Sequence, residues 1–379
     1  MNQRHMIPFV KPVYPQPRSL FAAFKEHLES GNYNDAVEST LEFEKKFARH
    51  VGSKYCVSVC NGTLGLVIAI RALQVGGNVI VPSFTFSASA HALAWNGIRP
   101  NFVDIDPETL NQTPETVEKA ISAGTTAILA THTFGNPCDI EGLHAVAKRH
   151  RLKLLFDSAN ALGSRYRGAL IGRFGDAEVF SFHATKILPL IEGGAIVTND
   201  RTLFGRMKLL RAQGNRGDGN CVLIGLNARM HPISALMGLQ GLNRLDDNLE
   251  RRSRSAQHYV RLLEQIPGLS FQKRDPWGVP NHQYLPIIVN RAEFGCSRDV
   301  LHAILQKDDI DTRKYFCPPI HKFRCYRHLC RRGDGRLHTT ERISKAVLCL
   351  PLDEEISMSM IGKICRAIAA VPAKRRARA

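Results

Sequence analysis

The run Phe180-Ser-Phe-His-Ala-Thr-Lys186, with the turn Glu192-Gly-Gly194 shortly after it, decides the fold of this chain. Its apolar start predicts a buried strand that ends a few residues before Lys186. Another apolar stretch, Leu152–Phe156, is followed directly by Asp157. Because parallel strands present their carboxyl ends at one edge of a sheet, we expect Lys186 and Asp157 to meet where open α/β sheets bind ligands.

The chain on either side of this run alternates short apolar stretches with helical patterns. Seven stretches predict the strands of one sheet that is covered on both faces: Tyr55–Val59, Val79–Val81, Asn101–Val103, Ala127–Ala130, Leu152–Phe156, Glu178–Phe182 and Ala195–Val197. Helices are expected between them, at Leu64–Leu73, Ser87–Trp95, Pro114–Ile121 and Ile140–Arg149. This alternation predicts an α/β domain with a mostly parallel seven-stranded sheet flanked by helices.

The C-terminal part is predicted to form a smaller domain. One long helical pattern runs from Pro232 towards Leu263, and Pro267-Gly268 ends it. Further elements are expected at Tyr284–Val289 (strand), Arg298–Lys307 (helix) and Ser357–Ala370 (helix). We therefore expect a large domain over residues 1–250, with an extended arm over about residues 1–20, and a small C-terminal α/β domain over residues 251–379.

Composition is that of an ordinary globular protein, with 44% hydrophobic and 22% charged residues. No apolar run approaches the ~20 residues of a membrane span and no secretory signal pattern is present, so a cytoplasmic location is expected. The ten cysteines lack the spacing of zinc ligands, and we expect no metal site. The formal charge of +17 favours anionic partners such as nucleotide-linked substrates. Nucleic acid is not expected, and the basic tail Lys374-Arg-Arg-Ala-Arg378 is interpreted as a solvated end.

Lys186 and Asp157 support a functional hypothesis. Most lysines are solvated surface residues, but the apolar segment Ile187-Leu-Pro-Leu190 would lower the pKa of the Lys186 amine. Asp157 could cap a loop, or its carboxylate could pair with a cation at the strand end. An amine that bonds covalently and a carboxylate that keeps a ring nitrogen protonated are what a pyridoxal phosphate (PLP) enzyme needs. The pair therefore predicts PLP as cofactor.

Neighbouring motifs offer further contacts for such a cofactor. Asn61-Gly62-Thr63 opens a predicted helix where a phosphate could bind, although these residues also suit an ordinary turn and helix cap. Ser181 could bond the phosphate, and His183 could do likewise, but packing is favoured for His183. Phe86 could stack on a flat ring, whereas Phe84 and Phe86 in an apolar neighbourhood are more often part of a core.

Taken in order along the chain, these motifs resemble the nucleotide-sugar aminotransferases of the DegT/StrS type, which are fold type I PLP-dependent transferases. The resemblance covers almost the whole chain. It rests on Val81-Pro-Ser-Phe-Thr-Phe86, Val103-Asp-Ile-Asp106, Thr131-His-Thr-Phe-Gly135-Asn-Pro, Phe156-Asp157, the run ending at Lys186, Glu192-Gly-Gly194, Gly225-Leu-Asn-Ala-Arg229-Met and Cys349-Leu-Pro-Leu352.

The resemblance implies roles for individual residues. Lys186 matches the lysine that bonds PLP, and Asp157 matches the partner of the pyridine nitrogen. Further cofactor contacts are implied for Gly62, Thr63, Phe86, Asn160, Ser181 and Asn227. Candidate substrate contacts are His183, Arg229, Tyr315 and His321. Since Asn227 matches an asparagine that reaches the neighbouring subunit's cofactor phosphate, the resemblance also implies a homodimer with shared active sites.

Two positions depart from the family's pattern. Asn160 stands where the family usually has glutamine or histidine, beside the ring hydroxyl of the cofactor. Ile187-Leu-Pro-Leu190 replaces a segment that is commonly more polar. Some relatives carry histidine in place of the lysine and act as dehydratases, and Lys186 argues against that reaction here.

The activity that the resemblance implies is amination of a nucleotide-diphosphate keto-sugar, with glutamate as the amino donor and 2-oxoglutarate as the by-product. A cyclitol ketone (inosose), as in aminoglycoside pathways, is the alternative substrate. Two alternatives come from other classes of protein. One is a PLP-binding regulator without turnover, and the other is a nucleic-acid-binding protein that uses the positive charge.

Overall fold

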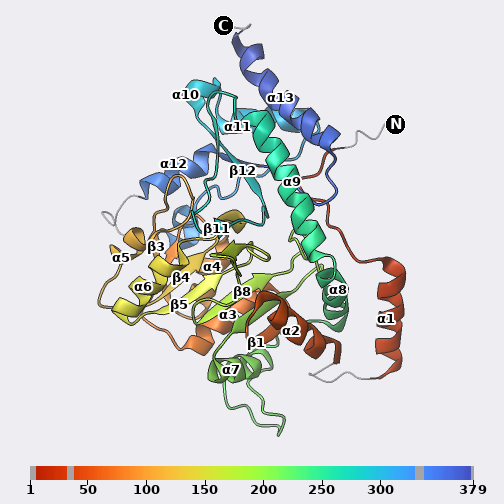
Figure 1. The fold of residues 1–379 in the computed structure, drawn as a ribbon. Coiled ribbons are helices and arrows are strands. Elements are labelled where there is room, and N and C mark those ends of the chain that lie inside the picture. The colour runs from red at the N-terminus through yellow and green to blue at the C-terminus, as the bar shows by residue number, and fades with distance from the viewer. Residues whose placement is uncertain (1–5, 32–37, 329–336, 377–379) are drawn as a thin grey trace.

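The structure, a computed structural model, describes residues 6–31, 38–328 and 337–376. A seven-stranded sheet lies at the centre of its larger part, in the order β1-β9-β8-β5-β4-β2-β3 (Figure 1). The strands are β1 (Tyr55–Val59), β2 (Asn78–Pro82), β3 (Arg99–Val103), β4 (Thr125–Thr131), β5 (Lys153–Asp157), β8 (Ala177–Ser181) and β9 (Gly194–Thr198). β9 runs antiparallel to β1 and β8, and the other neighbours are parallel. The predicted mostly parallel α/β sheet is confirmed, with each strand within two residues of its expected bounds.

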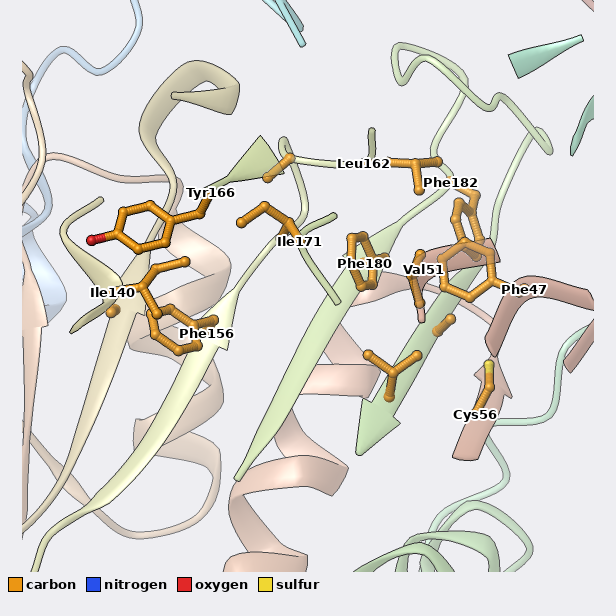
Figure 2. Packing of buried hydrophobic residues seen from close by; sticks show 14 of the residues in the cluster. Phe47, Val51, Cys56, Ile140, Phe156, Leu162, Tyr166, Ile171, Phe180 and Phe182 are labelled. Atoms are coloured by element: carbon orange, nitrogen blue, oxygen red, sulfur yellow. The ribbon is translucent and has the colours of Figure 1, made fainter. Parts of the chain in front are cut away.

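Helices cover both faces of this sheet. On one face lie α2 (Glu38–Val51), α6 (Ile140–His150) and α8 (Pro232–Leu242), and on the other lie α3 (Gly62–Leu73), α4 (Ser87–Trp95) and α7 (Arg201–Arg211). Figure 2 shows the packing on the first face, where Phe47 of α2 meets Phe180 of β8. Their ring centroids are 5.3 Å apart, in an edge-to-face arrangement that aromatic pairs prefer.

The smaller part is built on a three-stranded antiparallel sheet of β10 (Leu269–Phe271), β12 (Leu285–Val289) and β13 (Val347–Leu350). α11 (Arg298–Lys307), α13 (Met358–Arg376) and the later turns of α9 (Leu245–Leu263) pack on it, and α9 and α13 lie side by side (Figure 1). α9 contributes side chains to the cores of both parts, so the expected division near residue 250 falls inside a continuous helix. That division stays a prediction.

The single long helix expected from Pro232 to Leu263 is wrong. The structure has two helices there, α8 and α9, which meet at Asn243 and Arg244. The apolar spacing continues through the break because Leu242 and Leu245 pack against the same core from either side of it. A regular spacing of leucines therefore did not require one continuous helix.

The N-terminal arm packs on the smaller part of its own chain. The backbone of Ile7 bonds with that of Asp309 and Asp311, and Phe9 O accepts from Leu352 N at 3.2 Å. α1 (Pro17–Glu29) follows and lies beside α8, with none of its residues fully buried (Figure 1).

Shorter elements connect these units: α5 (Pro114–Glu118), η1 (Thr133–Gly135), β6 (Arg165–Tyr166), β7 (Ala169–Leu170), β11 (Gly278–Val279), α10 (Arg291–Phe294), η2 (Ile320–Lys322), η3 (Arg324–Tyr326) and α12 (His338–Ala346). No helix within the described ranges is long and apolar enough to cross a membrane. The end of the basic tail, residues 377–379, lies outside the described residues.

Candidate active site

A cavity of about 470 Å³ lies at the carboxyl ends of β4, β5 and β8. Its volume is in the range of small-molecule sites, and its position is the ligand-binding edge of an open α/β sheet. Most of the predicted site residues line it: Gly62, Thr63, Phe86, Asp157, Asn160, Ser181, His183, Lys186 and Tyr315.

Asp157 is the last residue of β5, and its side chain is buried at the cavity wall. Phe156 packs on the α2 and α6 face, so strand alternation turns Asp157 to the α3 and α4 face. Its carboxylate accepts hydrogen bonds from Ser89 Oγ at 2.7 Å and from Ala159 N at 3.1 Å. Burial raises the pKa of Asp157, whereas these two donors and the Lys186 charge lower it. A cation placed beside this carboxylate would offset the cost of burying its charge.

Lys186 reaches the same cavity from the loop after β8. Its Nζ donates to Asn160 Oδ1 at 2.6 Å and lies 5.7 Å from the centre of the Tyr284 ring. Burial lowers the pKa of the amine to about 8, against the opposing effect of Asp157. The lower pKa makes the free amine, which is the nucleophilic form, accessible near neutral pH. The short side chain of Asn160, a departure from the family's pattern, thus contacts the lysine directly.

The N-terminus of α3 forms another part of the cavity wall. Asn61 caps this helix by accepting a bond from Leu64 N at 2.9 Å, so the residue acts as an ordinary cap. A Cβ added to Gly62 would lie 3.0 Å from Ser181 Cβ, so glycine lets the helix approach the end of β8 without displacing it. The backbone N–H groups of the first turn, the Thr63 side chain and the Ser181 hydroxyl together suit an anion such as phosphate.

The two phenylalanines after β2 have different environments. Phe84 is fully buried in the core, whereas Phe86 is 58% exposed and lines the cavity. Phe86 is therefore available to cover a flat ring, and only Phe84 follows the expectation of core packing. On another side of the cavity, Tyr284 and Tyr315 stand against Phe9 of the N-terminal arm, with ring centroids 5.6 and 5.9 Å from that of Phe9.

Three predicted site residues do not line this cavity. Asn227 is exposed and Arg229 is partly buried, on either side of the buried Ala228. His321 is buried, where its Nδ1 pairs with Ser83 Oγ at 2.6 Å and its Nε2 with Glu341 at 3.3 Å. His183 does line the cavity, but its ring is exposed beside Thr185 instead of being packed in the core.

Sequence reasoning missed several cavity residues and their partners. Ser89, which donates to Asp157, lies in the first turn of α4, four positions after Thr85, and the two hydroxyls are 3.2 Å apart. The spacing of four residues between Thr85, inside the Phe84-Thr-Phe86 motif, and Ser89, in the helix that follows, was the available signal. The sequence predicts Tyr284 only as the first residue of a strand, and no periodicity marks it as a cavity residue.

The residues present fit a cofactor with a reactive carbonyl, a ring nitrogen and a phosphate. The cavity combines an amine of lowered pKa, a buried carboxylate and a glycine cradle at a helix N-terminus. PLP matches each of these groups. In the described part of the chain, no cluster of three or more histidine, cysteine or acidic side chains could hold a metal ion.

The chain is similar to a known family of proteins and to several of its members. The model of the DegT/DnrJ/EryC1/StrS aminotransferase family matches residues 17–369. The dTDP-4-amino-4,6-dideoxy-D-glucose transaminase of Shigella dysenteriae is 36% identical over 327 residues, which are 86% of this chain and 88% of the relative. The GDP-perosamine synthase of Escherichia coli O157:H7 is 36% identical over 323 residues, 81% of this chain and 85% of its own.

A solved structure extends the similarity to the fold. DesI, crystallised in the presence of its TDP-sugar product, superimposes with a TM-score of 0.92 at 34% identity. The match covers 99% of this chain and 96% of DesI.

Proposed function

Because this chain belongs to the DegT/DnrJ/EryC1/StrS aminotransferase family, we propose that it moves an amino group from glutamate to the keto group of a nucleotide-diphosphate sugar, with Lys186 and Asp157 as the catalytic pair. The chain is a PLP-dependent nucleotide-sugar aminotransferase. One observation carries the residue assignment. The Lys186 amine and the Asp157 carboxylate line one cavity, at the ends of β8 and β5.

Each residue has a separate task. When bound, PLP supplies a ring that accepts the electron pair left as a proton departs from the adjoining carbon. Asp157 binds the proton of the ring nitrogen, and Ser89 Oγ and Ala159 N stabilise its charged form. Lys186 would bond the cofactor, and its free amine would be the base that takes the proton from the carbon that carries the amino group. In the cofactor-free cavity, its pKa of about 8 leaves part of the amine uncharged near neutral pH.

The remaining cavity residues orient the reactants. The α3 N-terminus at Gly62 and Thr63, with the Ser181 hydroxyl, binds the phosphate. Phe86 would cover the ring of the cofactor, and Asn160 Oδ1 holds the Lys186 amine in the cofactor-free protein. Tyr284, whose pKa burial raises to about 12, stays protonated throughout the working pH range and closes the cavity on the smaller part's side.

The active unit is proposed to be a homodimer with shared sites. Within the described ranges, Lys186 is the only lysine or arginine that lines the cavity, so the cations that hold a diphosphate must come from outside it. An apolar surface next to Asn227 supports a second copy as their source, since Ile224 is 86% and Trp95 is 82% exposed. These two side chains border one shallow hollow. A partner on this surface would bring its Asn227 and Arg229 towards the first copy's cavity.

The assignment of Lys186 is tested by trapping. Borohydride reduction of the PLP-loaded protein, followed by peptide mapping, should place the label at Lys186. Lys186→Ala should lose the label, the visible absorption band and amino transfer, with a rate loss of at least about 10²–10⁴-fold. Lys153→Ala is the matched control, because Lys153 begins β5 and pairs with Asp176 at the surface. Retained turnover in Lys186→Ala would refute the catalytic role.

The substrate is tested with a panel of dTDP- and GDP-linked keto-sugars, with glutamate as donor and mass detection of the amino sugar. Activity on these compounds and none on an inosose is expected. The reverse result would favour a cyclitol aminotransferase. Sedimentation of wild type and Ile224→Asp tests the dimer, because a charge on the apolar surface should produce monomers of low activity. A cytoplasmic location stays a prediction.

A further inference from the structure

Gln283 lies in the segment 281–284, between β11 and β12, and its side chain is only 1% exposed. Its Nε2 donates to the carbonyl oxygen of Thr185 at 2.9 Å, and its Oε1 accepts from the backbone N–H of Ile187 at 3.2 Å. Thr185 and Ile187 are the two neighbours of Lys186. One side-chain amide therefore bonds the main chain on both sides of the cavity lysine.

The Gln283 backbone is itself fixed in place. Its N–H donates to Asn281 Oδ1 at 2.8 Å, and its carbonyl accepts from Arg252 Nη1 at 3.3 Å. Arg252 is fully buried and paired with Glu354, with 2.6 Å between Arg252 Nε and Glu354 Oε1. The side-chain amide of Gln283 therefore extends from a backbone that buried hydrogen bonds hold in place.

The segment 281–284 also fixes the position of Asn160, whose side chain contacts the Lys186 amine. Asn281 Nδ2 donates to the carbonyls of Asn160 and Leu162, both at 2.8 Å. The side chains of Asn160 and Lys186 then meet at 2.6 Å. A Cβ on Gly135, which has φ +90°, would lie 1.9 Å from Asn281 Oδ1, so this arrangement also requires a glycine in the loop after β4.

We propose that Gln283 is a positioning residue that fixes the main chain on both sides of Lys186 and thereby sets where the amine stands in the cavity. This proposal rests on Lys186 being the lysine that bonds the cofactor. A lysine side chain has four rotatable bonds, and it must first bond the cofactor and then carry a proton. Bonds to both flanking peptides confine its motion to the side chain, so the amine returns to the same place in each turnover.

A purely structural role for Gln283 predicts a different outcome, because loss of a buried amide then affects stability alone. Gln283→Met keeps the length of the side chain and removes both hydrogen bonds. The PLP-loaded variant should still trap the cofactor at Lys186. Its kcat should fall about 10²-fold, with little change in KM. The pH midpoint of the visible band should move by about one unit.

Hydrogen exchange supplies a readout that is independent of turnover. Exchange of a peptide containing Ile187 should speed up about tenfold in Gln283→Met, because its N–H loses its partner. Exchange in β12 should stay as in wild type. The control is Asn290→Ala, which removes the cap of α10 at the far end of β12. It should lower stability and leave kcat and the band midpoint unchanged.

Gln283→Glu tests the bonds in a second way. A protonated carboxyl can donate to Thr185 O and accept from Ile187 N, whereas the ionised form cannot donate. The kcat of this variant relative to wild type should therefore be close to one at low pH and fall as pH rises. A ratio independent of pH, or a Gln283→Met variant that loses only stability, would overturn the proposal. If borohydride reduction of the PLP-loaded wild type did not label Lys186, the proposed function would be overturned as well.

Discussion

The edge of the central sheet and the segment 281–284 both build the cavity, but by different means. At the sheet edge, β5 and β8 end in Asp157 and Ser181, and strand geometry alone directs both side chains to one face. In the segment 281–284, side-chain amides bond backbone groups of loops that are about 100 residues distant in sequence.

The sheet determines which side chains reach the cavity, and the hydrogen bonds of the segment determine the conformation of the loops that carry them. Parallel strands bring the Asp157 carboxylate and the Ser181 hydroxyl to the same cavity because their carboxyl ends lie at one edge of the sheet. The loops that follow the strands have no such constraint, and their conformation depends on partners such as Gln283 and Asn281. Substitutions at the sheet edge should therefore abolish most of the catalytic activity, whereas substitutions in the segment 281–284 should reduce the order of the loops and lower the activity less.

The largest effect is expected for Asp157→Asn. An amide cannot balance the positive charge of the ring nitrogen, so kcat should fall about 10²–10³-fold, with weaker retention of PLP. Steady-state kinetics and the absorbance of bound cofactor measure both effects. The fold should be kept, because burial already raises the pKa of this carboxyl and a neutral group is accepted at its position.

Ser89→Ala separates charge from hydrogen bonding at the same carboxylate. This variant removes the 2.7 Å bond to Asp157 and leaves the charge in place. A loss of about 10-fold is expected, the value of one hydrogen bond to a charged group. Equal losses in the two variants would mean that the orientation of Asp157, more than its charge, limits the rate.

Strand placement could be predicted from the sequence because it depends on local apolar stretches. All seven strands and helices such as Ser87–Trp95 lie close to their expected positions, and Asp157 and Lys186 come after two of those strands. The helix prediction failed between Pro232 and Leu263, where a regular apolar spacing passes through a turn at Asn243. Spacing reports which side chains are buried, and it does not report whether the backbone between them is continuous.

The contributions of Ser89, Gln283 and Asn281 could not be predicted in the same way. Each acts through a hydrogen bond to a residue distant in the sequence, and a polar residue among apolar neighbours has no periodic signal. The cavity roles of Asn227, Arg229 and His321 rested on resemblance alone, and these residues do not line the cavity of their own chain. Roles that require a second subunit stay predictions.

Asn281→Ala is the intermediate test, directed at the segment. It leaves the carbonyls of Asn160 and Leu162 and the N–H of Gln283 without their side-chain partner. Since Asn281 is buried, the free energy of unfolding should fall by roughly 2–3 kcal/mol, measured by urea titration. Asn290→Ala, at the far end of β12, should cost only about 1 kcal/mol as the loss of a helix cap. Equal costs would mean that the segment is no more constrained than the surface.

The smallest expected effect is a shift in pH dependence at Asn160, where the two regions meet. In the cofactor-free protein the uncharged Lys186 amine must attack PLP, so the rate of attachment should rise with pH and level off above the amine pKa of about 8. Asn160→Asp places a negative charge against Nζ, which favours the charged amine and should move the midpoint up by about one unit. Asn160→Gln keeps the neutral amide and should leave the midpoint near that of wild type. Stopped-flow absorbance across pH measures all three proteins, and an unmoved midpoint in Asn160→Asp would mean that the amine leaves Asn160 before it reacts.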